Sequence, residues 1–166
     1  MNLSKKILSW YDNNKRTLPW RISKNSKKNQ YYRILSEVML KQTQVKTVIP
    51  YFNNFVKKIP NLRALSKSSE KKILKLWEGL GYYSRAKNLH KTSKILIKKY
   101  NGKIPKNFVK LKELPGIGDY TANMLLALIY NESRIAVDGN VRRVLFRLFK
   151  ITNTKNIINL FKTKRR

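Results

Sequence analysis

The sequence predicts an all-α domain, and three observations support this class. Apolar residues recur with helical spacing along nearly all of the 166 residues, and no stretch alternates as a half-buried strand would. Glycine stands where several of these patterns stop. Apolar residues make up 42% of the chain, which is enough for one hydrophobic core and excludes a disordered basic tail.

The expected helices follow one another along the chain. The first amphipathic stripe runs from Leu3 to Tyr11, and Pro50 lies in the first turn of a later helix or kinks it. Asp119 can cap a strongly apolar helix. In chain order, we expect helices at 3–11, around 35–39, and at 45–56, 73–77, 89–100, 108–113, 119–129 and 141–149.

The charge indicates a polyanionic partner. The chain has 38 Lys and Arg against 8 Asp and Glu, a formal net charge of +30. A folded domain this basic usually binds a polyanion, and nucleic acid is favoured over an anionic membrane. A lysine-rich proteome is the alternative, although it does not explain why acids are so scarce. Each remaining acid is therefore a candidate functional residue.

Several classes of protein are disfavoured by what the sequence lacks. No apolar run approaches the roughly 18 residues of a membrane span, and the first residues lack the apolar core of a signal peptide. We therefore expect a soluble, cytoplasmic protein that associates with the nucleoid and is not secreted. Without cysteine, the chain has no disulfide, no thiol nucleophile and no cysteine-ligated metal site. We interpret His90, the single histidine, as structural.

A glycine-rich segment, Leu114-Pro115-Gly116-Ile117-Gly118, lies between two helical patterns. Two glycines separated by one residue permit a tight hairpin and let backbone N–H groups approach an anion. The next helix would begin there and present the positive end of its dipole to a phosphate. A Gly-x-Gly pattern mostly marks a turn, so a turn and a phosphate site both remain open on these residues alone.

Five motifs, in order, resemble the helix–hairpin–helix (HhH-GPD) superfamily of DNA glycosylases. The hairpin and catalytic-aspartate segments of that superfamily are similar to LPGIGDYTA at 114–122 and VDGNVRRV at 137–144. The adenine-specific (MutY-like) branch is similar to LPWR at 18–21, SEVMLKQTQ at 36–44 and GLGYYSRA at 79–86. The resemblance runs collinearly from about residue 7 to 149. It implies an all-α, helix–hairpin–helix glycosylase core.

The resemblance implies an adenine DNA N-glycosylase, a hydrolase that removes adenine mispaired with 8-oxoguanine or guanine. The base must leave the stack before its bond can be reached. The departing purine needs a proton, and the sugar becomes cation-like. By the resemblance, Glu37 protonates the adenine, Asp138 stabilises the sugar and helps direct the nucleophile, and Asn140 steadies Asp138 by hydrogen bonding.

Simpler interpretations of these three residues stay open. Glu37 can be an exposed helix carboxylate, although apolar Val38 and Met39 beside it favour a buried carboxyl with a raised pKa. Asp138 can be a helix N-cap, alone or in addition to its catalytic role. Asn140 can belong to an ordinary turn.

Tyr120 distinguishes two branches of the superfamily. In endonuclease III-like relatives, this position carries a lysine that attacks the sugar and then cleaves the backbone. A tyrosine cannot form that Schiff base. We therefore expect a monofunctional glycosylase with Tyr120 beside the sugar. The alternatives are a packed core aromatic at this position and an endonuclease III-like glycosylase that acts on damaged pyrimidines.

The resemblance also implies the side chains that contact DNA. Tyr82 would wedge beside the 8-oxoguanine, where stacking offsets part of the unstacking cost, and Gln42 and Thr43 would contact the opposing base. Trp20 and Arg21 would help form the adenine pocket. Packing or solvation is the alternative role for each of them. The expected contacts to the DNA backbone are Arg85, Arg142, Arg143, Pro115, Gly116, Ile117 and Gly118.

The chain departs from the family toward its C-terminus. We expect a core at 1–150 and a basic tail at 151–166 that is disordered or truncated. Within the core, helices 1–16 and 138–150 belong to an incomplete second subdomain, so their apolar stripes are under-covered. Family members usually close this subdomain with a four-cysteine [4Fe–4S] cluster, which this chain cannot ligate. The resemblance allows a monovalent cation at the hairpin but implies no other metal.

Three functional interpretations follow. The first is an active enzyme that works as a monomer on double-stranded DNA with a mispaired adenine and binds no membrane. The second is a catalytically inactive, truncated remnant that still binds DNA. The third is a gene fragment that folds poorly. Base excision that depends on Glu37 and Asp138 separates the first two, and a cooperative thermal transition excludes the third.

Overall fold

The computed structural model describes residues 3–22 and 27–150 of the chain. Within these ranges, the regular secondary structure is entirely α-helical, which confirms the predicted class. No helix in these ranges has both the length and the apolar character of a membrane span. The helices are α1 (Leu3–Asn14), α2 (Lys27–Leu40), α3 (Val45–Lys58), α4 (Leu62–Lys67), α5 (Glu70–Trp77), α6 (Ser84–Tyr100), α7 (Phe108–Lys112), α8 (Asp119–Tyr130) and α9 (Gly139–Phe149).

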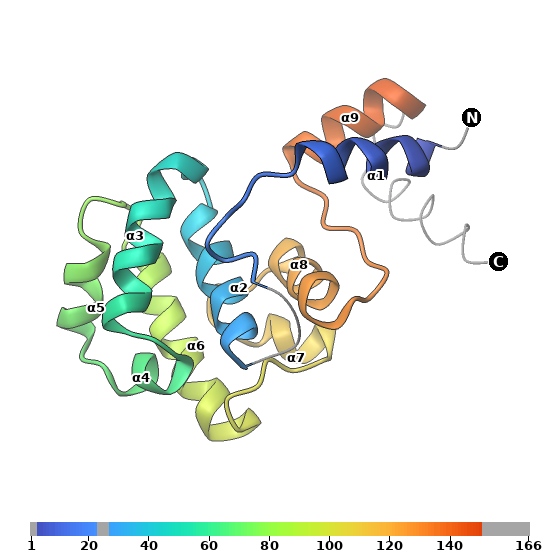
Figure 1. Cartoon of the computed structure of the whole chain (residues 1–166). Helices are drawn as coiled ribbons and strands as arrows, with labels where there is room; N and C mark the ends of the chain where they lie inside the picture. Colours follow the sequence, from blue (N-terminus) through green and yellow to red (C-terminus); the bar gives the residue numbers. More distant parts are fainter. Residues whose placement is uncertain (1–2, 23–26, 151–166) are drawn as a thin grey trace.

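Helix α2 is the central element of the fold. It packs against α3, α6 and α8, while α4 and α5 pack against α6, and α7 packs against α8. Figure 1 shows α2 between the group formed by α3 to α6 and the pair α7–α8. Because α2 contacts both groups, side chains near its C-terminal end can interact with loops from either one.

An aromatic cluster fixes one face of α2 and α3. The ring of Phe52 meets those of Trp20 and Tyr32 edge-on, with centroids 5.2 and 5.1 Å apart. Phe55 meets Trp77 in the same way at 6.0 Å. Edge-to-face pairs add to the stabilisation that comes from burying the rings. This cluster holds Trp20, which was predicted to line the base pocket, in a buried position.

Two local features differ from what the sequence predicts. Helix α4 was not expected, because six residues are too few to show a helical period; Asn61 starts it by accepting a hydrogen bond from the Ala64 N–H at 2.8 Å. The predicted capping role of Asp119 is wrong. Gly118 is the N-cap of α8, and the Asp119 carboxylate lies 2.7 Å from the Lys112 ammonium instead.

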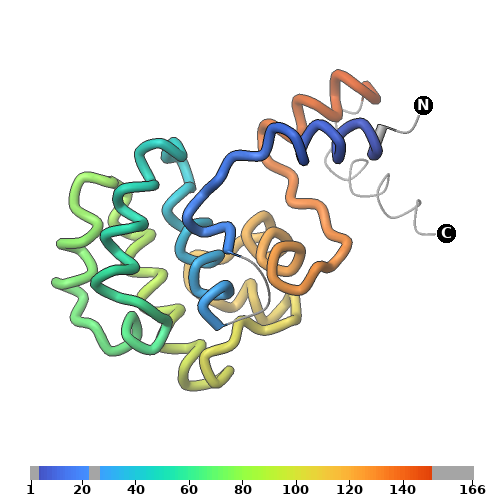
Figure 2. The backbone as a smooth tube through the Cα atoms, in the orientation of Figure 1, coloured from blue at the N-terminus to red at the C-terminus, as the bar shows by residue number. Residues whose placement is uncertain are grey.

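Helices α1 and α9 extend from the edge of the main group of helices (Figure 1). Residues 131–138 connect α8 to α9 without regular structure, as the backbone trace in Figure 2 shows. Apolar side chains on both helices are exposed, for example Trp10 at 64% and Leu148 at 53%. The prediction of under-covered apolar stripes is therefore confirmed. The predicted tail at 151–166 lies outside the described residues.

Candidate active site

A pocket of about 560 Å³ surrounds Glu37. Its walls come from α1 and the segment that follows it, the C-terminal half of α2, the first residue of α3 and two residues of α8. The structure thus brings Trp20 and Arg21 to the same pocket as Glu37. The lining residues are Tyr11, Lys15, Arg16, Thr17, Leu18, Trp20, Arg21, Arg33, Ser36, Glu37, Leu40, Val45, Met124 and Leu128.

The Glu37 carboxyl is only partly exposed, and its environment favours the protonated form. Burial raises the pKa of Glu37, and the positive charges of Lys41 and then Arg33 oppose that rise. None of the ion pairs among residues 3–22 and 27–150 includes Glu37. A carboxyl that keeps its proton at higher pH than usual can act as a general acid.

Tyr120 interacts electrostatically with Glu37 and with Asp138. Burial raises the pKa of the Tyr120 hydroxyl, and the negative charges of Glu37 and Asp138 raise it further. Tyr120 is therefore within electrostatic reach of both carboxylates. Asp138 also caps α9, because its Oδ1 accepts a hydrogen bond from the Val141 N–H at 2.7 Å. One carboxylate oxygen thus anchors Asp138 at the start of α9.

Asn140 has a different partner from the predicted one. Its Oδ1 accepts a hydrogen bond from Arg143, and the side chain is exposed in the first turn of α9. The backbone N–H of Val141, and not Asn140, is the group that steadies Asp138 here. Arg142 is also exposed on α9, while Arg143 is held by Asn140.

The hairpin between α7 and α8 is docked on α6 and α2. Thr92 of α6 donates to the Pro115 carbonyl at 2.9 Å, and the Lys41 ammonium donates to the Gly116 carbonyl at 2.8 Å. Gly116 has a φ of +78°, and a Cβ on it would lie 3.1 Å from the Cβ of Asn88. Only glycine fits this turn without strain, which confirms the expected hairpin geometry.

The two predicted duplex-entering loops present strained, exposed residues. Gln42 and Tyr82 have φ angles of 58° and 48°, in the left-handed region that residues with a Cβ rarely adopt. Gln42 is exposed, and Tyr82 is 59% exposed. Thr43 is partly buried and hydrogen-bonded to Arg85. Such strain persists only where surrounding structure holds it, and it is common at ligand-contacting positions.

The prediction that Arg85 binds a DNA phosphate is wrong, because its side chain is buried, with 9% exposure. Its guanidinium donates to the carbonyls of Val38 and Met39 at 3.3 and 3.0 Å, and to that of Lys41. The first two carbonyls belong to the last turn of α2, where no intrahelical donor remains. On its other side, the same guanidinium donates to Thr43 Oγ1 and to the carbonyls at 80 and 81, each at 3.2 Å.

Sequence reasoning missed Arg33 and Lys41, the two cations that affect the pKa of Glu37. Arg33 stands four residues before Glu37 on α2, and Lys41 stands four residues after it, just beyond the last residue of the helix, a spacing that brings side chains together on one side of a helix. This spacing was a readable signal in the sequence. His90 is buried, as its interpretation as a structural residue requires.

The four-cysteine iron–sulfur cluster that the resemblance implies for the family cannot be ligated by this chain, because it contains no cysteine. In the part of the chain that the structure describes, no group of three or more His, Asp or Glu side chains could hold a metal ion. In the hairpin, the carbonyls of Pro115 and Gly116 already accept hydrogen bonds from Thr92 and Lys41.

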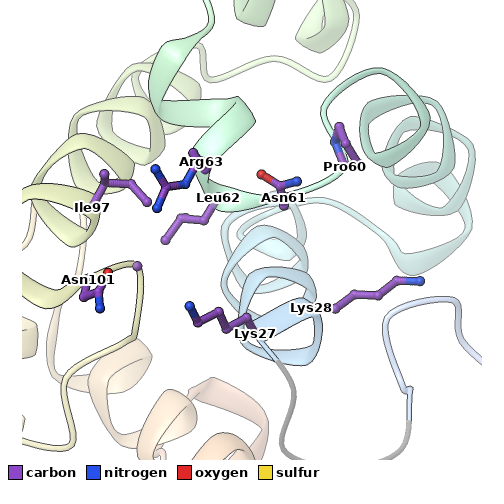
Figure 3. Close-up of a pocket in the computed structure, with 9 residues that line it drawn as sticks. Lys27, Lys28, Pro60, Asn61, Leu62, Arg63, Ile97 and Asn101 are labelled. Atoms are coloured by element: carbon purple, nitrogen blue, oxygen red, sulfur yellow. The ribbon is translucent and has the colours of Figure 1, made fainter.

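A second pocket, of about 420 Å³, lies at the other end of α2. Figure 3 shows Lys27 and Lys28 from the start of α2 and Arg63 from α4 around it. Glu37 lies ten positions after Lys27 along the helix, a rise of about 15 Å. This pocket is therefore separate from the one around the candidate acid.

The fold and the site define an all-helical domain with a hairpin docked beside an acid-bearing pocket. The family described as "HhH-GPD superfamily base excision DNA repair protein" matches residues 35–164. The chain belongs to this superfamily.

Individual relatives agree with this assignment. The chain is 49% identical over 93% of its length to the adenine DNA glycosylase of Buchnera aphidicola subsp. Baizongia pistaciae, and 40% identical over 86% of its length to that of Homo sapiens. It spans 43% and 27% of these two proteins, less than half of either. Among solved structures, a thermostable thymine-DNA glycosylase aligns with a TM-score of 0.82, at 25% identity, over 96% of this chain and 75% of that one. A non-covalent endonuclease III–DNA complex aligns with a TM-score of 0.75, at 22% identity, over 99% and 78% of the two chains, and supports the fold.

We expect Glu37→Gln to stabilise the fold increasingly as pH rises. Because burial raises the pKa of Glu37 in the folded state, the stability it contributes is complete below its unfolded pKa and is lost as pH rises through its folded pKa. Glutamine does not ionise, so the Glu37→Gln variant does not lose this stability as pH rises. Urea denaturation in steps of pH, with exposed Glu113→Gln as the control, measures the difference. A stability difference between Glu37→Gln and wild type that does not change with pH contradicts the prediction.

We expect Arg85→Met to destabilise the protein by about 2 kcal/mol or more, since it leaves buried carbonyls without a donor. Arg142→Met is the matched control, because Arg142 is exposed, and its effect should stay within about 0.5 kcal/mol. Denaturant unfolding measures both variants. Equal losses in the two variants would show that the buried hydrogen bonds of Arg85 do not hold the fold.

Proposed function

We propose that this chain is the core of a DNA N-glycosylase that removes adenine mispaired with 8-oxoguanine or guanine. The observation that carries the proposal is Glu37, a glutamate whose pKa is raised by burial, in a base-sized pocket. Tyr120 interacts electrostatically with Glu37 and also with Asp138. The pocket volume of about 560 Å³ lies within the usual range for small-molecule sites. Relatives named adenine DNA glycosylase support the choice of base.

In the proposed reaction, the flipped adenine enters the pocket beside Trp20 and meets the protonated Glu37. Transfer of this proton to the purine turns it into a better leaving group. The sugar gains positive charge as the N-glycosidic bond breaks, and the Asp138 carboxylate stabilises that charge. A water molecule then forms the new bond to the sugar carbon, and the proton that it loses returns to the Glu37 carboxylate. The cap at Val141 N holds Asp138 in place without neutralising it.

The proposed enzyme is monofunctional. Backbone cleavage by lyase chemistry requires an amine that attacks the sugar, and the residue that interacts electrostatically with both Glu37 and Asp138 is Tyr120, whose phenol cannot form a Schiff base. The hydroxyl is held in its neutral form, since its pKa is raised. Tyr120 can therefore donate a hydrogen bond at the sugar. Excision should leave an abasic site that breaks only on treatment with alkali.

The proposed substrate is double-stranded DNA. The net charge of +30, the N-terminal end of α8 at the hairpin and exposed Arg142 support phosphate binding. Exposed Gln42 and Tyr82 support entry into the duplex at the mispair. We propose that the enzyme acts as a monomer in the cytoplasm, on the DNA of the nucleoid. We place α1 and α9 in a second subdomain, since both extend from the main group of helices.

Single-turnover excision from a duplex with one adenine opposite 8-oxoguanine tests this function. We expect strand breakage that appears after hot alkali and not before it. Glu37→Gln and Asp138→Asn should each lower the rate by about 100-fold or more, because each removes a group that acts in the transition state. Glu78→Gln is the control: it changes an exposed carboxylate that does not line the Glu37 pocket, and it should retain the wild-type rate.

Two outcomes would contradict the proposal. A wild-type chain that folds and binds the duplex but releases no base is a DNA-binding remnant. Strand breakage without alkali indicates lyase chemistry and contradicts the assignment of Tyr120.

A further inference from the structure

Lys41 stands four residues after Glu37, immediately beyond the end of α2. A Glu–Lys pair with this spacing and order ordinarily forms an ion pair on a helix surface. Here the Lys41 ammonium donates to the Gly116 carbonyl of the hairpin at 2.8 Å. Among residues 3–22 and 27–150, no ion pair includes either Glu37 or Lys41. The Gly116 carbonyl therefore binds the Lys41 ammonium, which would otherwise form an ion pair with Glu37.

The Gly116 carbonyl is held in position by contacts on both sides of the turn. Thr92 fixes the neighbouring Pro115 carbonyl by a hydrogen bond, and the left-handed backbone of Gly116 lies against Asn88. Both contacts come from α6, which does not carry Glu37. The position of the Lys41 ammonium therefore depends on how the hairpin docks on α6.

We propose that Lys41 is a positioning residue for base excision, and that the DNA-binding hairpin holds its ammonium away from Glu37 through the Gly116 carbonyl. This inference rests on the proposed function. It connects the hairpin, which the proposal places on a DNA phosphate, to the acid that protonates the base. Displacement of the hairpin releases Lys41 to pair with Glu37.

The charges around Glu37 show what such release would do. Lys41, just beyond α2, and Arg33 on α2 lower its pKa, while burial, the larger effect, raises it. Tyr120 faces it from α8, and its hydroxyl stays neutral because its pKa is raised. The pocket wall after α1 adds three cations to this environment, namely Lys15, Arg16 and Arg21. A direct contact with Lys41 would add a close positive charge, stabilise the carboxylate and lower the pKa of Glu37 further.

A titration of Glu37 in the free protein tests the inference. The chain has five glutamates, so carboxyl-¹³C glutamate labelling gives few signals, and the one lost in Glu37→Gln is assigned to Glu37. Two variants disturb the hairpin: Gly116→Ala, which strains the turn, and Thr92→Val, which only removes the hydrogen bond to Pro115. Each variant is titrated with Lys41 present and with Lys41→Met.

We expect the pKa of Glu37 to fall when either hairpin variant carries Lys41, and to stay at the Lys41→Met value when Lys41 is absent. The inference is overturned if neither hairpin variant lowers the pKa, or if the fall is the same without Lys41. Thr92→Val keeps the test valid should Gly116→Ala fail to fold. Excision by the wild type is measured separately, so loss of the proposed function and failure of this coupling give different results.

Discussion

The contacts of Arg85 with the end of α2 are the interaction on which the site depends. A helix leaves its last carbonyls without donors, and burying them unpaired is costly. Arg85 satisfies those of Val38 and Met39, and the same planar group reaches Thr43 and the loop before Tyr82. One side chain therefore fixes the end of the acid-bearing helix and both loops that are proposed to enter the duplex.

The site combines two requirements that oppose each other. DNA binding requires positive charge, and the chain carries a net charge of +30. A general acid requires that positive charge stay out of contact, because a close cation would ionise it. The structure separates the two by geometry: Arg85 is occupied by carbonyls, and Lys41 by the hairpin. Burial then dominates at Glu37 and favours the protonated form.

The sequence predicted most of the helical order and the hairpin, because period and glycine position are local properties. It also predicted Trp20, Arg21 and Glu37 as one pocket, although through resemblance and not through spacing. It could not predict the burial of Arg85, since an arginine beside a turn looks the same whether its partners are phosphates or carbonyls. The partners of Arg85 lie up to 47 residues away in the chain, and only the packing of α6 on α2 brings them together.

A crystal structure of the chain bound to DNA tests the central claim most directly. The duplex should carry a non-cleavable 2′-fluoro-deoxyadenosine opposite 8-oxoguanine, so that the unreacted base stays in place. The measured quantity is the distance from the Glu37 carboxyl oxygens to the nearest purine ring nitrogen. The account predicts an extrahelical adenine in the Glu37 pocket at hydrogen-bond distance, about 2.6–3.2 Å. An adenine that stays stacked, or that leaves the helix and lies away from Glu37, would contradict it.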